Sequence, residues 1–168
     1  MGEVNLARVD ERLIHGQVMT TLSQKAGVNS IFVVDDVVAK DKFMRGLYQS
    51  AGGRTGQKTI VITTDKAKYY WDEFNFKDYS CILIAKTIKV MYELVKHGVV
   101  MKELNIGGIA KKDPEKDLQV TKAVYLNKED AMLLKEMNEK YGVEDIYFQA
   151  TPSLPRTELK EVLKKFDL

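Results

Sequence analysis

Apolar residues along the chain form short runs typical of buried strands, and these runs alternate with longer stretches of helical spacing. Seven strands are predicted, over Val4–Val9, Ser30–Val34, Lys58–Thr63, Ser80–Ala85, Glu103–Ile106, Thr121–Tyr125 and Glu144–Gln149. Helices are predicted over Gly16–Lys25, Val38–Ser50, Asp65–Trp71, Thr87–His97, Asn127–Tyr141 and Pro155–Phe166, with a loop at Ala51–Gly56. This alternation predicts an α/β fold in which helices cover both faces of a mostly parallel, twisted sheet.

Several polar or glycine-containing segments directly follow predicted strands. They are Arg8–His15, Asp35-Asp36, Ala85-Lys86 and Ile106–Gly108. In open parallel sheets, ligands bind beyond the carboxyl ends of the strands. We therefore expect these segments to meet at one edge of the sheet, although they lie far apart in the sequence.

Composition narrows the classes of function. The length of 168 residues fits a single domain over residues 1–168, and 45% hydrophobic with 30% charged residues is ordinary for a soluble protein. A net charge of +2 does not favour binding to nucleic acid or to an anionic membrane. Cys81, the single cysteine, excludes an internal disulfide and a cysteine-based zinc cluster, and no metal site or cofactor is predicted. Neither a signal peptide nor an apolar stretch of about 18 residues is seen, so no direct membrane insertion is expected.

The segment with the most chemistry reads RVDERLIHGQ and ends at the start of the first predicted helix. It places His15 close to Arg8 and Arg12, whose planar guanidinium groups match phosphate oxygens. Histidine carries protons near neutral pH and also acts as a nucleophile. Amide groups at a helix N-terminus attract anions, Gly16 lets a phosphate approach the backbone, and Asp10 is placed to orient the imidazole or an arginine. These residues predict a histidine that handles a phosphoryl group, against the alternative of a packed or capping histidine.

The segment Arg8–Val18 resembles the active-site segment of the IIB components of the mannose/fructose/sorbose family of the sugar phosphotransferase system. The likeness continues through Val33–Asp41 (VVDDVVAKD) and Glu103–Ile109 (ELNIGGI), and it follows nearly the whole chain in order. In that family the histidine matching His15 accepts a phosphoryl group from the phosphohistidine of component IIA. It passes the group to a sugar held by the membrane components IIC and IID. The resemblance implies phosphorylation on Nδ1, a seven-stranded α/β sheet, and a cytoplasmic protein that reaches the membrane through IIC and IID. A homo-oligomer is compatible with the sequence.

Each predicted site residue has a role in phosphoryl transfer. His15 is the transient carrier, Arg8 and Arg12 bind the phosphoryl group, and Asp10 orients the cluster. Supporting positions, as backbone or amide donors or as walls of the cleft, are Gly16, Gln17, Asp35, Asp36, Gly107 and Gly108.

Some of these residues have simpler interpretations. Asp35 and Asp36 either cap the next helix or line the His15 cleft, and a magnesium-binding acidic pair like that of receiver domains is a weaker match. The stretch Asn105–Gly108 forms either a backbone nest for an anion or a tight turn. The aromatic residues of Tyr69–Phe76 either stack on a sugar or cover the sheet, and packing is favoured.

Two alternative functions stay open. A nucleotidyltransferase could use an adenylate-binding histidine on a similar sheet, but such enzymes usually carry a His-x-Gly-His motif, and Val18 stands where the second histidine would be. A non-catalytic regulatory member of the family would fold correctly and accept no phosphoryl group. The sequence does not name the sugar.

Overall fold

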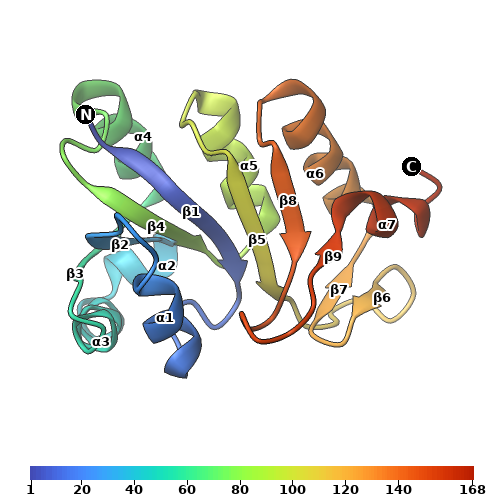
Figure 1. The fold of residues 1–168 in the computed structure, drawn as a ribbon, viewed down its shortest axis with the longest axis horizontal. Helices are drawn as coiled ribbons and strands as arrows, with labels where there is room; N and C mark the ends of the chain where they lie inside the picture. The colour runs from blue at the N-terminus through green and yellow to red at the C-terminus, as the bar shows by residue number, and fades with distance from the viewer.

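The computed structural model describes residues 1–168, and its centre is a seven-stranded sheet in the order β3-β2-β4-β1-β5-β8-β9 (Figure 1). Its strands are β1 (Glu3–Asp10), β2 (Ser30–Val34), β3 (Lys58–Ile62), β4 (Ser80–Ala85), β5 (Glu103–Gly108), β8 (Asp145–Phe148) and β9 (Thr157–Glu158). All neighbouring strands are parallel except β9, which runs antiparallel to β8. The predicted α/β fold with a mostly parallel seven-stranded sheet is confirmed, and β1 is its middle strand.

Helices cover both faces of this sheet, as predicted. They are α1 (Gly16–Ser23), α2 (Asp36–Lys40), α3 (Lys42–Gly53), α4 (Thr64–Phe74), α5 (Ile88–His97), α6 (Lys128–Lys140) and α7 (Leu159–Lys164). Successive residues of a strand point to opposite faces, so Ile31 and Val33 of β2 pack with α1 and α2. Phe32 and Val34 pack on the other side with α4 to α7. The interior strands are therefore apolar on both faces where helices cover them.

The face that carries α1 to α3 is covered only in part. Leu104 and Ile106 of β5 belong to the core beneath α4 to α7, so Asn105 between them points to the opposite face. The same alternation places Tyr147 of β8 on that face, in register with Asn105. In Figure 1, α5 and α6 lie behind β5 and β8, and no helix lies in front of these strands. Polar side chains occupy this uncovered part of the sheet.

The predicted helix over Val38–Ser50 is wrong, because two helices meet at Asp41. Asp41 has an extended backbone, and its side chain accepts hydrogen bonds from the amides of Phe43 and Met44, which starts α3. The helix then continues to Gly53, so the predicted loop at Ala51–Gly56 is also wrong in its first half.

Further corrections concern the second half of the chain. The strand predicted over Thr121–Tyr125 is a separate antiparallel hairpin of β6 (Leu118–Thr121) and β7 (Val124–Leu126), because residues 122 and 123 form its turn. The helix predicted over Pro155–Phe166 begins only at Leu159, since the two preceding residues pair with β8 as the edge strand β9. The helix predicted over Asp65–Trp71 runs from Thr64 to Phe74, with Thr63 as its cap.

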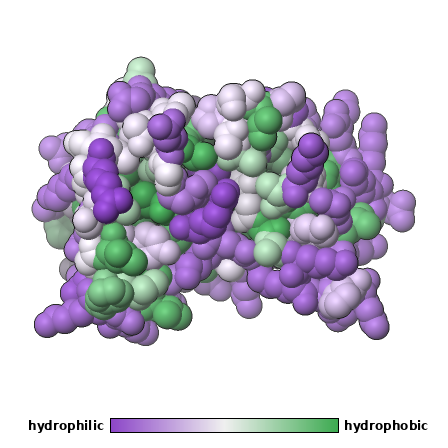
Figure 2. Space-filling view, turned by 90° about the horizontal axis from the view of Figure 1, so that it is seen from below, coloured by the Kyte–Doolittle hydropathy of each residue, from purple (hydrophilic) through white to green (hydrophobic).

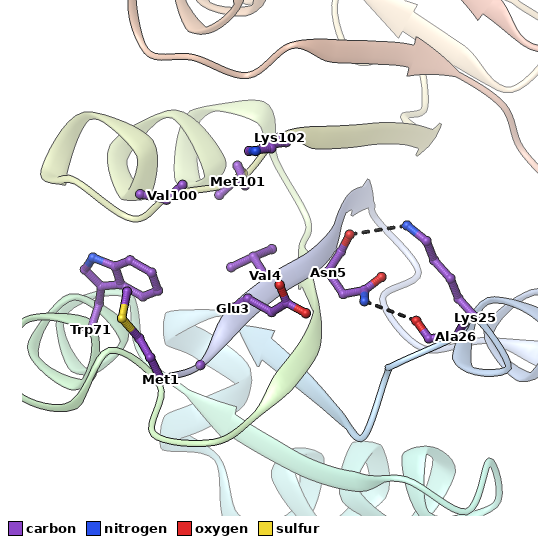
Figure 3. A pocket seen from close by; sticks show the side chains of 11 residues that line it. Met1, Glu3, Val4, Asn5, Lys25, Ala26, Trp71, Val100, Met101 and Lys102 are labelled. Carbon is purple, nitrogen blue, oxygen red and sulfur yellow. Dashed lines mark hydrogen bonds between the residues drawn. The ribbon is translucent and has the colours of Figure 1, made fainter.

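A cavity of about 570 Å³ lies at the end of the sheet where the parallel strands begin. Figure 3 shows Met1 and Trp71 on one side of it and Lys25 on the other, with Asn5 and Glu3 of β1 between them. Near this end the aromatic residues pack on one another, and Phe76 is fully buried against Phe32, at 4.8 Å between ring centroids. The cavity lies at the opposite end of β1 from Asp10 and His15, so it does not belong to the predicted site.

Candidate functional site

The candidate site lies at the carboxyl end of the middle strand, where β1 leads into α1. The chain turns there, and the amide of Leu13 donates to the carbonyl of Asp10 at 2.9 Å. Leu13 adopts a left-handed backbone with φ of 56°, which is uncommon for a residue other than glycine. Its side chain and that of Ile14 are buried in the core beneath α1, so packing holds this turn in place. His15 follows at the N-cap position of α1.

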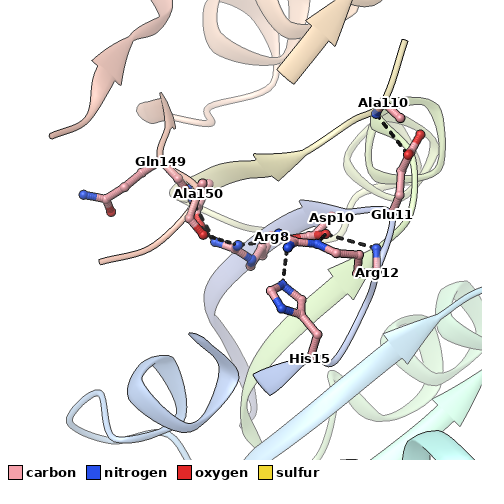
Figure 4. A network of polar contacts seen from close by, with 9 residues as sticks. Arg8, Asp10, Glu11, Arg12, His15, Ala110, Gln149 and Ala150 are labelled. Carbon is pink, nitrogen blue, oxygen red and sulfur yellow. Dashed lines mark hydrogen bonds and ion pairs between the residues drawn. The ribbon is translucent and has the colours of Figure 1, made fainter. Parts of the chain in front are cut away.

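The Asp10 carboxylate is the centre of the site (Figure 4). It is fully buried, and its Oδ2 atom accepts from Nη2 of Arg8 at 3.0 Å, Nη2 of Arg12 at 3.0 Å and Nε2 of His15 at 3.1 Å. Its Oδ1 atom accepts from the amide of Arg12 at 3.0 Å and from Nε of Arg12 at 3.1 Å. Every oxygen of this buried anion is hydrogen-bonded, as a buried charge requires.

The two arginines of the motif have different surroundings. The Arg8 side chain is 1% exposed, and its terminal nitrogens contact Asp10, the side chain of Asn105 and the carbonyls of Gln149 and Ala150. The Arg12 side chain is 54% exposed, and only one edge of its guanidinium group faces Asp10. Arg8 is therefore an interior residue, whereas Arg12 presents a charged edge to solvent.

Charge and burial oppose each other in this cluster. Burial acts to raise the pKa of Asp10, but the hydrogen bonds from Arg12 and the charges of both arginines outweigh it, so this pKa lies below its ordinary value. Burial lowers the pKa of Arg8, and the charge of Asp10 opposes that change. Arginine stays protonated in proteins, so the cluster consists of two cations around one anion.

His15 is held by one ring nitrogen. An ionised carboxylate only accepts hydrogen bonds, so the contact with Asp10 requires a proton on Nε2, and in the neutral imidazole the lone pair is then on Nδ1. The His15 side chain is 22% exposed and forms no capping hydrogen bond to α1. The first amides of α1, from Gly16 and Gln17 onward, therefore have no side-chain cap and are available to an anion. Gly16 has a φ of 46°, a backbone conformation that favours glycine.

The acidic pair after β2 serves the neighbouring helices. Asp35 accepts from the amide of Val38 at 2.9 Å and caps α2. Asp36 accepts from the amide of Thr64 at 2.7 Å, at the start of α4. Neither forms a hydrogen bond or ion pair with the Asp10 cluster, and their predicted supporting role stays a prediction.

Gly107 and Gly108 are strand residues, so neither the tight turn nor the anion nest is formed. Both lie within β5 without the positive φ that a nest would place at one of two successive residues. A Cβ atom on Gly107 would overlap the guanidinium of Arg8, and one on Gly108 would lie 3.3 Å from Nη2 of Arg12. The glycines make room for the two arginines.

The sequence predictions placed Asn105 only in a possible backbone nest and gave its side chain no role, and they did not include the carbonyls of Gln149 and Ala150. Asn105 is 2% exposed, accepts from Arg8 and donates to the carbonyl of Gln149 at 3.0 Å. A signal for it existed, since an amide stands between two apolar residues of a predicted buried strand. The two backbone carbonyls give no signal in the sequence, because every residue has a carbonyl.

A family model described as PTS system sorbose subfamily IIB component matches residues 4–167. The chain belongs to this family. It is a IIB phosphocarrier, a component with a transferase role in a sugar phosphotransferase system, and the family prediction made from the Arg8–Val18 segment is confirmed.

Relatives of this IIB chain agree with the family match. The sorbose-specific EIIB component of Klebsiella pneumoniae is 34% identical over 141 residues, which cover 84% of each chain. The N-acetylgalactosamine-specific enzyme IIB component 1 of Escherichia coli (strain K12) is 27% identical, with 93% of this chain and 96% of the relative covered. The crystal structure of manxB from Thermoanaerobacter tengcongensis superposes with a TM-score of 0.89 at 33% identity, covering 99% of this chain and 98% of the other.

None of the helices is both long enough and apolar enough to cross a membrane. The family match gives no support to the nucleotidyltransferase alternative.

Proposed function

We propose that His15 carries the phosphoryl group, and that it does so on Nδ1. The observation that supports this proposal is the contact between Nε2 of His15 and the buried Asp10 carboxylate, which keeps the lone pair on Nδ1. The partly exposed ring stands at the start of α1, where backbone amides attract an anion.

The phosphoryl group passes through His15 in two transfers. The Nδ1 lone pair attacks phosphorus in the phosphohistidine of component IIA, a P–N bond forms at His15, and the donor's P–N bond breaks with its electron pair returning to the donor imidazole. The His15 ring then carries a positive charge, which Asp10 balances through the Nε2 proton. In the second transfer a sugar hydroxyl attacks phosphorus, a P–O bond forms, the P–N bond at His15 breaks with its electron pair returning to Nδ1, and the hydroxyl proton leaves to water.

Arg12 is the residue that we assign to the phosphoryl oxygens. Its charged group is exposed and is oriented by Asp10, so it can stabilise the negative charge of the group in transfer. The sequence motif also predicted this role for Arg8. Because Arg8 is buried with its terminal nitrogens already bonded, we propose instead that Arg8 holds Asp10 in place.

We propose that component IIA and the membrane components IIC and IID dock in turn around His15, with residues 1–168 acting as one cytoplasmic IIB domain. Figure 2 shows the end of the molecule where the parallel strands finish, with hydrophilic residues over much of it and apolar residues gathered on the side of α1 to α3. The exposed apolar side chains of α2 and α3 are Val37, Phe43 and Leu47. Such a partly apolar surface suits partners that bind and leave.

The sugar is not assigned to this chain. Relatives of similar fold are named for different sugars, sorbose and N-acetylgalactosamine among them. We propose that the sugar is selected by the membrane components that hold it, and that the IIB chain supplies only the phosphoryl group.

Phosphate labelling tests this proposal. Incubation with phosphoenolpyruvate, the general phosphotransferase proteins and a IIA component should label the chain with acid-labile phosphate, and ³¹P NMR should assign it to Nδ1. His15→Ala should abolish labelling, whereas the matched control His97→Ala should leave it unchanged. Undiminished labelling of His15→Ala would refute the carrier, and phosphate on Nε2 would refute the assigned nitrogen.

A further inference from the structure

We propose that Asn105 is a positioning residue for phosphoryl transfer, acting on His15 through Arg8 and Asp10. This inference rests on the proposed role of His15 as carrier. Asn105 itself is buried in β5 and is not needed to touch the phosphoryl group.

Strand register brings Asn105 and Arg8 together. They are direct partners in the parallel pairing of β1 with β5, and alternation along both strands points their side chains to the same face. Oδ1 of Asn105 accepts from Nη1 of Arg8, and Nδ2 of Asn105 donates to the carbonyl of Gln149. The amide thus links the middle strand of the sheet to the end of β8.

The location of this pair explains why an amide is needed. No helix covers β5 and β8 on this face, and the chain leaving β8 supplies the carbonyls of Gln149 and Ala150 instead. Together with the missing Cβ atom of Gly107, these groups form a fitted recess for the Arg8 guanidinium. Asn105 is the one side chain in this recess, apart from Asp10, that accepts from Arg8.

A leucine or alanine at this position would leave Arg8 buried with one acceptor fewer. A buried cation that loses a partner is costly, so Arg8 is expected to shift toward the remaining acceptors or toward water. Nε of Arg8 is already buried without a partner, and without Asn105 Nη1 would keep only the Gln149 carbonyl, at 3.4 Å, so the guanidinium would be still more poorly hydrogen-bonded.

A shift of Arg8 would be transmitted to His15 through one atom. Nη2 of Arg8 and Nε2 of His15 both bind Oδ2 of Asp10, at 3.0 Å and 3.1 Å. Movement of this oxygen weakens the bond that fixes the proton on Nε2. The expected result is an imidazole that samples both tautomers and presents the Nδ1 lone pair for only part of the time.

The tautomer of His15 separates this role from a merely structural one. ¹⁵N-histidine labelling gives two imidazoles, and His97, bonded to Asp72 at 2.8 Å on the surface, is the internal reference. An ordinary imidazole is neutral at about pH 9, where long-range ¹H–¹⁵N spectra report which nitrogen carries the proton. The wild-type protein should show His15 with its proton on Nε2.

Three variants complete the experiment. Asn105→Leu removes both hydrogen bonds at similar volume, and Asn105→Asp keeps an acceptor for Arg8. Asn29→Ala is the matched control. Asn29 lies at the opposite end of the sheet, where it also accepts one hydrogen bond, from the amide of Ser80, and donates another, to the carbonyl of Asp78.

We expect Asn105→Leu to shift His15 to a mixture of tautomers and to slow phosphoryl uptake from phosphorylated IIA by about tenfold. Asn105→Asp and Asn29→Ala should keep the wild-type tautomer, and His97 should not change in any variant. A folded Asn105→Leu protein with the wild-type tautomer would overturn the proposal, as would a mixed tautomer in Asn105→Asp. If Asn105→Leu does not fold, Asn105→Ser takes its place: a mixture of tautomers is again the expected result, and the wild-type tautomer would overturn the proposal.

The tautomer is measured without phosphate, so the two proposals fail separately. A shifted tautomer in Asn105→Leu with no labelling of wild-type His15 would remove the carrier role and keep only the control of the His15 tautomer by Asn105. Normal labelling of wild-type His15 with an unchanged tautomer in Asn105→Leu would keep the carrier role and remove the role of Asn105.

Discussion

The chain contains two histidines, and each is paired with an aspartate in nearly the same way. Nε2 of His15 lies 3.1 Å from Oδ2 of Asp10, and Nε2 of His97 lies 2.8 Å from Oδ2 of Asp72. The two pairs differ in their surroundings. Asp10 is fully buried at the end of the middle strand, whereas Asp72 is 52% exposed on α4. A histidine–aspartate distance alone does not identify a site.

The number of groups that hold each carboxylate explains the difference. Asp10 accepts from both arginines of the motif in addition to His15, and Arg8 is in turn fixed by Asn105. Asp72 has His97 as its side-chain partner, at the surface end of α5. Solvent competes with such an exposed pair, and its energy is small. We therefore expect the pair at the end of β1, and not the exposed pair, to hold a single imidazole tautomer.

The largest expected difference between the pairs is in rate. Asp10→Asn should slow phosphoryl uptake by about 10²- to 10⁴-fold, because an amide no longer requires the proton on Nε2 and does not balance the charged ring. Asp72→Asn should leave the rate unchanged. Initial rates with phosphorylated IIA measure both, and equal rates in the two variants would remove the distinction between the pairs.

Asp10→Asn and Asp72→Asn should also differ in their free energy of unfolding. Asp10→Asn leaves Arg8 buried without its charged partner, so we expect a loss of about 3–5 kcal/mol in the free energy of unfolding. Asp72→Asn breaks an exposed pair and should cost less than about 1 kcal/mol. Urea titrations followed by circular dichroism measure this, and a similar midpoint for both variants would contradict the buried network.

Arg12 distinguishes the pairs in another way, since the His97 pair has no arginine beside it. Arg12→Ala should slow phosphoryl uptake by about a hundredfold, because a charge that faces the transferred group is lost. Its effect on unfolding should be much smaller than that of Asp10→Asn, because Arg12 is largely exposed. An Arg12→Ala protein that is fast but unstable would make Arg12 a structural residue instead.

The smallest predicted effect is on the pH dependence of stability. The pKa of Asp10 is lower in the folded protein than in the unfolded chain, so this carboxylate stabilises the fold above about pH 4, the value of an ordinary aspartate. That contribution should disappear as the pH falls through the folded pKa. Unfolding free energies measured from about pH 6 down to about pH 2 should therefore fall more steeply for the wild type than for Asp10→Asn. Parallel curves would mean that Asp10 is not held as an anion by the arginines.

The residues of the candidate site fall into a local and a distant group. Arg8, Asp10, Arg12 and His15 lie within one strand end and one turn, so a single stretch of sequence brings them together. Asn105, which contacts Arg8, lies 97 positions away from it in the sequence, and Ala150, whose carbonyl also contacts Arg8, lies 142 positions away. Contacts of this second kind depend on which strands are neighbours, and alternation of apolar residues does not give strand order.

The two main errors in the predicted fold have different causes. The helix break at Asp41 had a local signal, an aspartate able to cap a new helix, within a run that otherwise favours continuous helix. The edge strand β9 had no such signal, because two residues adopt extended structure only where β8 offers unpaired backbone groups. Helical spacing after Pro155 therefore predicted too long a helix.

By itself the sequence determined the alternation of strands and helices, the position of His15 at the start of a helix and the membership of the IIB family. These depend on residue order and on spacing along the chain, which are local properties. Only the tertiary structure decided that Arg8 is an interior residue and Arg12 an exposed one. Both are arginines of the same motif, and their burial differs because β5 and the chain after β8 enclose the first and leave the second at the surface.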